Sequence, residues 1–173
     1  PELLVEPVDV AVAPISGNVY VLDRRSRAVK GFDPSGAAIG FFGGEGSAEH
    51  QFNSPVALEI DHQDSIYDAD VRNRAVKRYL PDGTFDEIYE GMHSSTPFDN
   101  VSALTYDADS KRLYVLDGSL GKVVGLDTSV EPVVYHEIFS VEVTPARDAK
   151  LDIEFRDGMF YIITQQGGIK LYD

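Results

Sequence analysis

One segment of this chain recurs at a fixed spacing, and this recurrence limits what the chain can fold into. Its central tyrosine recurs every 47 residues, at Tyr20, Tyr67, Tyr114 and Tyr161. Only 9 of the 173 residues are Tyr, so chance does not explain a shared register at four positions. The segments around them read GNVYVLDRRSRAVKGF, SIYDADVRNRAVKRY, RLYVLDGSLGKVVGL and GMFYIITQQGGIKLY. A period of this length indicates repeated structural units.

Each repeat consists of short β-branched and aromatic runs separated by turn residues such as Pro81-Asp82-Gly83, which predicts β-strands. In the first two repeats, we predict strands at 8–13, 19–22, 28–32, 37–42, 56–60, 66–69, 75–80 and 84–89. In the last two, we predict strands at 101–106, 113–116, 122–126, 133–139, 151–155, 159–163 and 168–171. The fourth repeat therefore lacks a fourth strand. Residues 3–5 form a further predicted strand, and no helical periodicity of useful length is present.

Successive antiparallel four-strand units predict an all-β protein of the β-propeller class, with about four blades. We expect a single propeller domain, or part of one, over residues 1–173, with repeats at about 7–46, 52–91, 98–139 and 147–173. The repeated tyrosines should lie buried between blades, so Tyr67→Ala should cost about 3–5 kcal/mol. The chain is either part of a larger propeller or a closed four-bladed ring. In the ring, Glu2–Val5 would supply the missing strand; we favour the first interpretation.

The repeats resemble the NHL repeat, whose pattern places a proline first, then Gly-Asn-Ile-Tyr-Val-Ala-Asp, then an Asn-x-Arg-Ile segment. The matching residues are Pro7, Gly17, Asn18, Tyr20, Asp23, Pro55, Tyr67, Asp70, Asn73, Tyr114 and Asp117. Ala28 and Ala75 stand where the pattern has Arg, and Thr164 stands where it has Asp. The resemblance implies a propeller that usually has six blades. It implies little about function, because the matching residues are structural.

Charge and composition limit the possible partners. The formal net charge is −14, so the chain repels phosphate backbones on average, and we consider a nucleic acid an unlikely partner. There is no Cys, which excludes disulfides and thiolate metal sites. No apolar run is long enough to predict a membrane span. The cellular compartment stays open, with an extracytoplasmic location slightly favoured.

Three aspartates are candidate metal ligands, because Asp23, Asp70 and Asp117 each end the second strand of a repeat. Three histidines, His50, His93 and His136, are expected in the links on the same face of the propeller. Such a ring could bind a cation such as calcium, as in propellers of the gluconolactonase and regucalcin type, which look similar in architecture. We favour a structural interpretation, in which each Asp accepts hydrogen bonds from loop N–H groups or pairs with a nearby Arg. We expect no cofactor, with calcium as the possible exception.

Two basic loops are the most unusual feature of this acidic chain. Arg24, Arg25 and Arg27 follow the second strand of the first repeat, and Arg72 and Arg74 occupy the corresponding loop of the second repeat. These five residues are candidates for a cationic patch that binds an acidic partner. Alternatively, the arginines pair with neighbouring carboxylates and cover the blade edge with their aliphatic stems.

The function that we favour is a non-enzymatic NHL-like interaction or scaffold module. It would bind a protein or other ligand through its loop face, because propeller loops vary freely on a rigid scaffold. The partner would be a protein or the remaining blades of a larger propeller. The alternative is a calcium- or zinc-dependent hydrolase, lactonase-like, or a lyase. Its ligands would come from Glu59, Asp68, Asp70 and Asp117.

Overall fold

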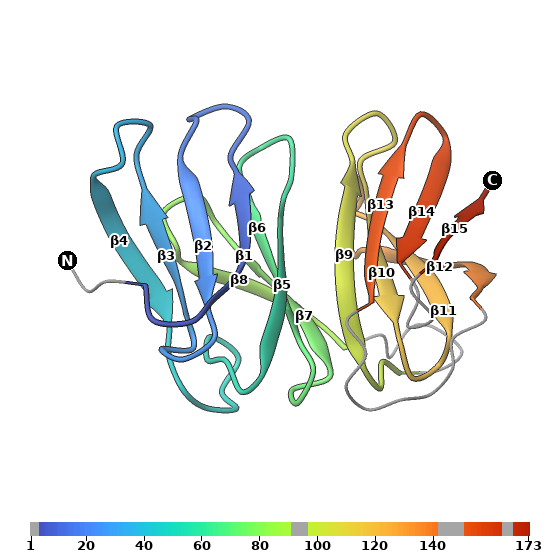
Figure 1. Ribbon diagram of the computed structural model, residues 1–173, viewed down its shortest axis with the longest axis horizontal. Helices are drawn as coiled ribbons and strands as arrows, with labels where there is room; N and C mark the ends of the chain where they lie inside the picture. The colour runs from blue at the N-terminus through green and yellow to red at the C-terminus, as the bar shows by residue number, and fades with distance from the viewer. Residues whose placement is uncertain (1–3, 91–96, 142–150, 164–167) are drawn as a thin grey trace. The chain divides into compact units, whose positions relative to one another are not determined.

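A computed structural model of the chain describes residues 4–90, 97–141, 151–163 and 168–173 (Figure 1). The regular structure of these residues is β-strand. Within them, no helix occurs that could cross a bilayer. The chain divides into two compact units, Pro1–Glu90 and Gly91–Asp173, which we describe one at a time.

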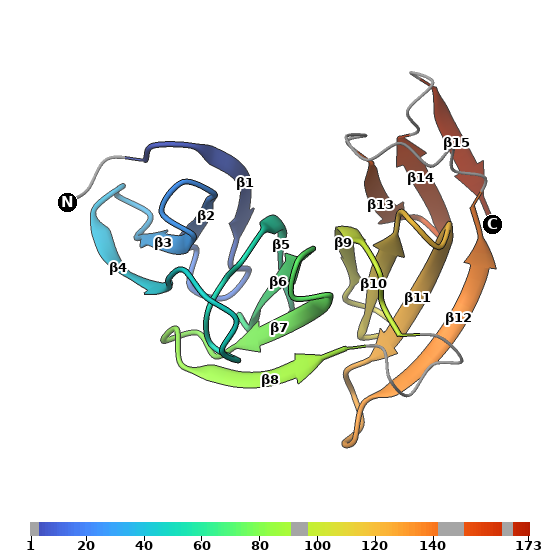
Figure 2. The ribbon, with the colours of Figure 1, turned by 90° about the horizontal axis from the view of Figure 1, so that it is seen from below.

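The first unit contains two four-stranded antiparallel sheets. The first sheet has the order β1-β2-β3-β4 and the second has the order β5-β6-β7-β8 (Figure 2). The strands of the first sheet are β1 (Pro7–Val12), β2 (Val19–Asp23), β3 (Ala28–Phe32) and β4 (Ala38–Gly43). Those of the second are β5 (Pro55–Ile60), β6 (Ile66–Asp70), β7 (Ala75–Tyr79) and β8 (Phe85–Tyr89). Each strand thus pairs with its neighbour in sequence, as predicted for a blade.

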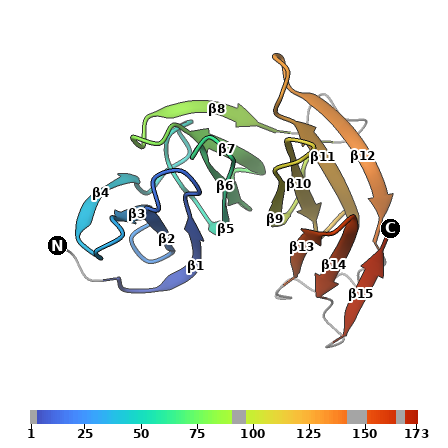
Figure 3. The same ribbon diagram turned by 90° about the horizontal axis from the view of Figure 1, so that it is seen from above.

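The second unit contains a four-stranded and a three-stranded sheet with the same sequential order (Figure 3). The third sheet consists of β9 (Val101–Asp107), β10 (Arg112–Asp117), β11 (Lys122–Asp127) and β12 (Val134–Ser140). The fourth consists of β13 (Asp152–Arg156), β14 (Met159–Ile163) and β15 (Ile169–Tyr172). Each of these strands matches a strand predicted from the sequence, with ends that differ by at most one residue. The fourth sheet has three strands, as the sequence predicts.

The predicted strand at residues 3–5 is wrong for Leu4 and Val5, which belong to no strand; Leu3 lies outside the described residues. The backbone N–H of Val5 instead donates to Asp23 Oδ2 at 2.6 Å. The N–H of Val5 is therefore hydrogen-bonded to a side chain and not to a neighbouring strand.

The core of the first unit lies between its two sheets. Tyr20, Leu22 and Val29 of the first sheet belong to one buried cluster with Leu58, Ile60, Ile66 and Tyr79 of the second. The Tyr79 ring contacts Phe42 at a centroid distance of 4.6 Å and Phe52 at 5.6 Å. These aromatic contacts add to area burial and hold the two sheets face to face.

The second unit has an equivalent core between its third and fourth sheets. Tyr114 and Leu116 of the third sheet cluster with Ile153, Phe160 and Ile162 of the fourth. The Tyr114 ring meets Phe160 edge-on at a centroid distance of 4.8 Å. In the first, third and fourth sheets, the second strand therefore contributes an aromatic side chain to the core of its unit. These side chains are Tyr20, Tyr114 and Phe160.

The repeated tyrosines do not all have the predicted environment. Tyr20, Tyr67 and Tyr114 are buried, as predicted, but the side chain of Tyr161 is 37% exposed. In β14, Phe160 and Ile162 enter the core of the unit. Because neighbouring residues of a strand point to opposite faces, Tyr161 lies on the other face of the fourth sheet. The prediction of a buried tyrosine is therefore wrong at this position.

Candidate functional site

The three strand-end aspartates, Asp23, Asp70 and Asp117, are fully buried at the ends of β2, β6 and β10. Each carboxylate accepts N–H bonds from the segment that precedes the first strand of its own sheet. Asp70 accepts from Asn53 at 2.7 Å and from Ser54 at 2.9 Å. In the other two sheets, the donors to the strand-end aspartate are Val5, Glu6, Asp99 and Asn100. Each strand-end aspartate thereby joins the second strand to the segment that enters the sheet.

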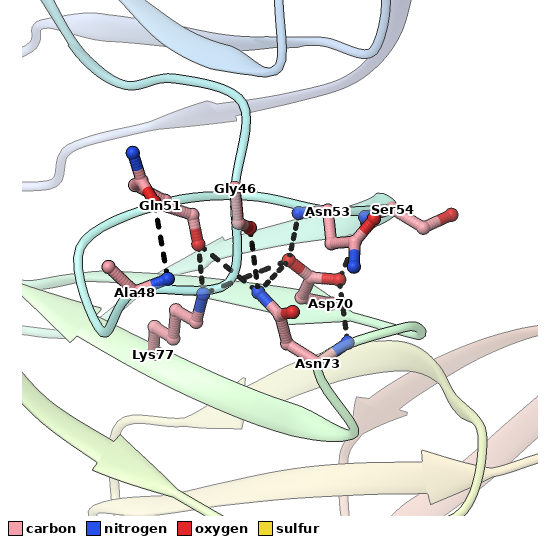
Figure 4. A network of polar contacts seen from close by, with 8 residues as sticks. All are labelled: Gly46, Ala48, Gln51, Asn53, Ser54, Asp70, Asn73 and Lys77. Carbon is pink, nitrogen blue, oxygen red and sulfur yellow. Dashed lines mark hydrogen bonds and ion pairs between the residues drawn. The ribbon is translucent and has the colours of Figure 1, made fainter.

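The same carboxylates also hold the loop that follows the second strand, as Figure 4 shows for Asp70. The backbone N–H of Asn73 donates to Asp70 Oδ1 at 3.1 Å, and its side-chain amide donates to Asp70 Oδ2 at 2.8 Å. Lys77 Nζ lies 3.8 Å from Asp70 Oδ2 and also donates to the carbonyl of Gln51 (Figure 4). The side-chain amide of Asn73 also donates to the carbonyl of Gln51, so the loop over 71–74 is hydrogen-bonded to the link between the two sheets.

Asp23 is held in the same way as Asp70. Its carboxylate accepts the N–H of Ser26 at 3.1 Å and the ammonium of Lys30 at 3.2 Å. Burial alone would raise the pKa of Asp23, but the N–H groups of Val5 and Ser26 and the Lys30 ammonium outweigh it and hold the pKa far below its usual range. Asp23 is therefore ionised at neutral pH.

These contacts agree with a structural role for the strand-end aspartates. Each carboxylate receives several N–H donors, whereas a cation would need the same oxygen lone pairs. Within the described residues, no group of three or more His, Cys, Asp or Glu side chains could hold a metal ion. His50 is exposed, His136 lies in strand β12 and not in a link as expected, and His93 falls outside the described residues. The metal interpretation stays a prediction with no support from the described part of the chain.

The arginine loops, 24–27 and 71–74, have the same backbone conformation in the two sheets. Arg27 and Arg74 occupy equivalent positions, and both have a positive φ, 49° and 53°. Arg24 pairs with Glu6, and Arg27 pairs with Glu45. Two of the five arginines therefore pair with acids, as the alternative interpretation expects, and the side chains of Arg24, Arg25, Arg72 and Arg74 are exposed.

Of the acidic residues of the enzyme alternative in the first unit, Asp68 and Asp70 share a face of the second sheet, but Glu59 does not. Glu59 pairs with Tyr67 across β5 and β6, whereas Asp68 pairs with Leu58. Side chains alternate between the two faces of a sheet, so Glu59 lies on the opposite face from Asp68 and Asp70. The carboxylate of Glu59 accepts the N–H of Ile60 at 2.8 Å.

Asp68 differs from every equivalent residue of the chain. The corresponding second-strand residues are Val21, Val115 and Ile162. Asp68 is fully buried, and neither of its carboxylate oxygens has a hydrogen-bond partner. Burial, and next the negative charge of Asp70, raise the pKa of Asp68 well above its usual range, against the opposing effect of Lys77. The sequence pattern marks Asp68 as unusual, but only the structure shows that its carboxylate is unpaired.

Two further aspartates connect the sheets of the first unit and escaped the sequence analysis. Asp64 accepts the N–H groups of Ile15 and Ser16, both at 2.9 Å, from the hairpin turn of the first sheet. At the adjacent first strands, Asp9 Oδ2 accepts the N–H of Leu58 at 2.7 Å. The sequence gives no signal for these contacts, because an Asp-rich turn looks the same whether its carboxylates bond locally or to another sheet.

The comparisons with known proteins agree with this architecture. No protein-family model matches the chain. The chain is similar to the E3 ubiquitin-protein ligase NHLRC1 of Homo sapiens, with 28% identity over 120 residues, which are 66% of this chain and 30% of that protein. The chain therefore spans less than a third of the length of this curated relative.

Three solved structures are similar in fold and cover nearly the whole chain. They are U3-55K (TM-score 0.69, 11% identity), a chain of the nidogen/laminin complex (0.73, 13%) and virginiamycin B lyase from Staphylococcus aureus (0.64, 13%). The matches cover 99%, 96% and 95% of this chain but only 53%, 59% and 54% of those chains. At such low identity the likeness concerns the fold alone. The chain is an all-β protein made of four β-propeller blades.

Proposed function

We propose that this chain is an NHL-like propeller module without enzymatic activity, and that it binds an acidic segment of a partner protein through the arginine loops. The observation that carries the proposal is the pair of equivalent, rigidly held loops with outward-facing arginines. Arg25, Arg72 and Arg74 are exposed, while the backbone beneath them is held by buried carboxylates. A rigid loop loses little conformational entropy on binding.

The chemistry of the loops favours an acidic protein segment. Arginine presents a planar fork of donors that binds carboxylates in bidentate geometry. The net charge of −14 disfavours long polyanions such as RNA, whereas a short acidic peptide can stay within the local positive field of one loop pair.

The relatives support an interaction role. The relative NHLRC1, at 28% identity, is an E3 ubiquitin-protein ligase. The virginiamycin B lyase is similar in fold at 13% identity, which supports no transfer of its activity.

The proposal predicts that reversing the two exposed charges removes binding. We expect Arg25→Glu/Arg72→Glu to weaken binding of a fluorescent poly-glutamate peptide by about tenfold or more, because two favourable charge contacts become repulsive. Fluorescence anisotropy at low and at moderate salt measures the affinity, and the unsubstituted chain should lose affinity as salt rises.

A matched control is Lys111→Glu/Arg156→Glu, which changes the net charge by the same amount at exposed positions outside the arginine loops. Its affinity should stay near that of the unsubstituted chain, and circular dichroism should show that both variants are folded. If the two double variants weaken binding equally, the effect comes from net charge and the proposed binding surface is wrong.

A further inference from the structure

We infer that Glu6 and Glu45 compete with the acidic partner segment for the first arginine loop, residues 24–27, and so weaken its binding. The inference rests on the proposed function, because it concerns how the same arginines are occupied before a partner binds. Each of these two acids forms an ion pair with an arginine of the loop and is held beside it by backbone contacts. The two carboxylates therefore take the place that the partner's carboxylates would take.

Glu6 is held beside Arg24 by the backbone as well as by the side chain. The N–H of Arg24 donates to the carbonyl of Glu6 at 2.9 Å, and the N–H of Glu6 donates to Asp23 Oδ1 at 3.4 Å. The Arg24 guanidinium also donates to the Glu6 carboxylate, and this hydrogen bond lowers the pKa of Glu6, so the carboxylate is ionised at neutral pH. The Arg24 and Glu6 side chains are 51% and 44% exposed, so a carboxylate from solvent can reach the guanidinium.

Glu45 is held beside Arg27 in a similar way. The N–H of Gly44, the residue before Glu45, donates to the carbonyl of Arg27 at 2.7 Å, and Glu45 forms a β-bridge with Phe52. Arg27 Nη1 lies 2.5 Å from Glu45 Oε1. The Glu45 side chain is 75% exposed, so its carboxylate stays solvated when a competing carboxylate displaces it. Such an exposed ion pair is weak, and a partner with several carboxylates can break it.

A blade can be built without the pair of Glu6 and Arg24, as the second sheet shows. There, the N–H of Val71 donates to the carbonyl of Ser54 at 3.1 Å, just as the N–H of Arg24 donates to the carbonyl of Glu6. Uncharged side chains thus occupy the positions of the ion pair, and the backbone contact is the same. The carboxylate of Glu6 is therefore not needed to hold the loop, and its neutralisation should leave the fold intact.

The chemistry of the charged groups makes the two acids competitors of the partner. The carboxylates of the partner and those of Glu6 and Glu45 bind the same guanidinium N–H donors. Glu6 and Glu45 belong to the same chain as the arginines, so their effective concentration at the loop is high and a partner must displace them. Their negative charges also lower the positive potential that attracts the partner. Both effects disappear when the two acids are neutralised.

The test is the affinity of the full chain and of its variants for the fluorescent poly-glutamate peptide. Fluorescence anisotropy measures it at about 0.1 M salt, where exposed charges more than about 10 Å apart are largely screened. Glu6→Gln/Glu45→Gln should bind about tenfold more tightly than the unsubstituted chain, because two competing carboxylates are removed and the size of the side chains is kept. The matched control, Asp109→Asn/Glu154→Gln, removes the same charge at exposed positions outside the arginine loops and should leave the affinity unchanged.

Removal of the paired arginines separates competition from a general effect of charge. In a chain that carries Arg24→Gln/Arg27→Gln, the two acids no longer have their paired arginines. Adding Glu6→Gln/Glu45→Gln to that chain should therefore tighten binding much less than it does in the unsubstituted chain. An equal gain in affinity in both backgrounds overturns the inference, and so does an equal gain in the control variant. Circular dichroism should show that all variants are folded.

The same assay distinguishes failure of the inference from failure of the proposed function. If Arg25→Glu/Arg72→Glu abolishes binding but Glu6→Gln/Glu45→Gln leaves the affinity unchanged or weaker, the proposed function stands and the inference is wrong. If neither the unsubstituted chain nor the glutamine variant binds the peptide, both the proposed function and the inference are wrong.

Discussion

At the scale of single residues, two aspartates of the same strand have opposite effects on stability. Asp70 is buried with several N–H donors, whereas Asp68, two residues earlier, is buried with no hydrogen-bond partner. An unsatisfied buried carboxyl group lowers the free energy of unfolding, because its water contacts are lost without replacement. Asp68 is therefore a weak point in the packing of the first two sheets.

We predict that Asp68→Val raises the free energy of unfolding by about 1–3 kcal/mol at neutral pH, because the unpaired carboxyl is removed. Valine fits the position, since Val21 and Val115 occupy it in the first and third sheets. Urea unfolding followed by circular dichroism measures the change. The reciprocal variant, Val115→Asp, should be destabilised, and a stable Val115→Asp protein would contradict the argument.

The increase in the free energy of unfolding caused by Asp68→Val should depend on pH, and the direction of this dependence can be predicted. The titratable groups that interact electrostatically with Asp68 are Asp70, Lys77 and Tyr79 of the second sheet. The pKa of Asp68 is raised in the folded state, so above about pH 4 the folded chain holds a proton that the unfolded chain has released. The contribution of Asp68 to stability is then largest below about pH 4 and falls as pH rises towards the folded pKa.

The stabilisation of Asp68→Val relative to the unsubstituted chain should therefore grow with rising pH. Unfolding curves at several pH values between acid and neutral conditions check this. If the difference in the free energy of unfolding between the two proteins were constant across that range, the pKa of Asp68 would be the same in the folded and unfolded states. Asp23 acts in the opposite direction, because its lowered pKa gives stability that is lost as pH falls below about 4.

At the scale of elements, the second strand of each sheet determines how the blades pack. Tyr67 is fully buried, its hydroxyl donates to Asp61 Oδ2 at 3.1 Å, and its ring stacks on Tyr89. These contacts join the second strand to the turn before it and to the outer strand of the same sheet.

We predict that Tyr67→Ala lowers the free energy of unfolding by about 3–5 kcal/mol, through loss of ring packing and of one buried hydrogen bond. Tyr67→Phe keeps the ring and should cost only about 1 kcal/mol, since it loses the hydroxyl alone. Thermal or urea unfolding of both variants gives the comparison. Equal effects of the two substitutions would show that the hydroxyl bond, and not the ring, carries the stabilisation.

The strands themselves could be predicted closely from the sequence, because their signals are local. Alternation in β5 and the turn residues at 81–83 are properties of neighbouring residues, and the structure places each strand within a residue of its expected position. The wrong strand prediction at Leu4 and Val5 also arose from the use of local signals. Their apolar character resembles a strand, but the Val5 N–H is taken by Asp23, which lies 18 residues away.

At the scale of the whole molecule, net charge and stability should be linked. A net charge of −14 makes the folded chain repel itself, which lowers the free energy of unfolding. Salt screens this repulsion, so we expect the melting temperature to rise between low and moderate salt. Calorimetry over a range of salt concentrations measures this, and a melting temperature that stays constant or falls would contradict the expectation.

The sequence by itself determined the repeat, the strand order and the faces of the strands, because periods of 2 and 47 residues are visible without knowledge of the fold. Only the tertiary structure decided what each polar or aromatic residue does. Asp23, Asp64 and Asp68 are one residue type in three environments, and Tyr161 shares its register with Tyr67 but not its burial. Burial and hydrogen-bond partners depend on which segments meet in space, and residues far apart in sequence supply those segments.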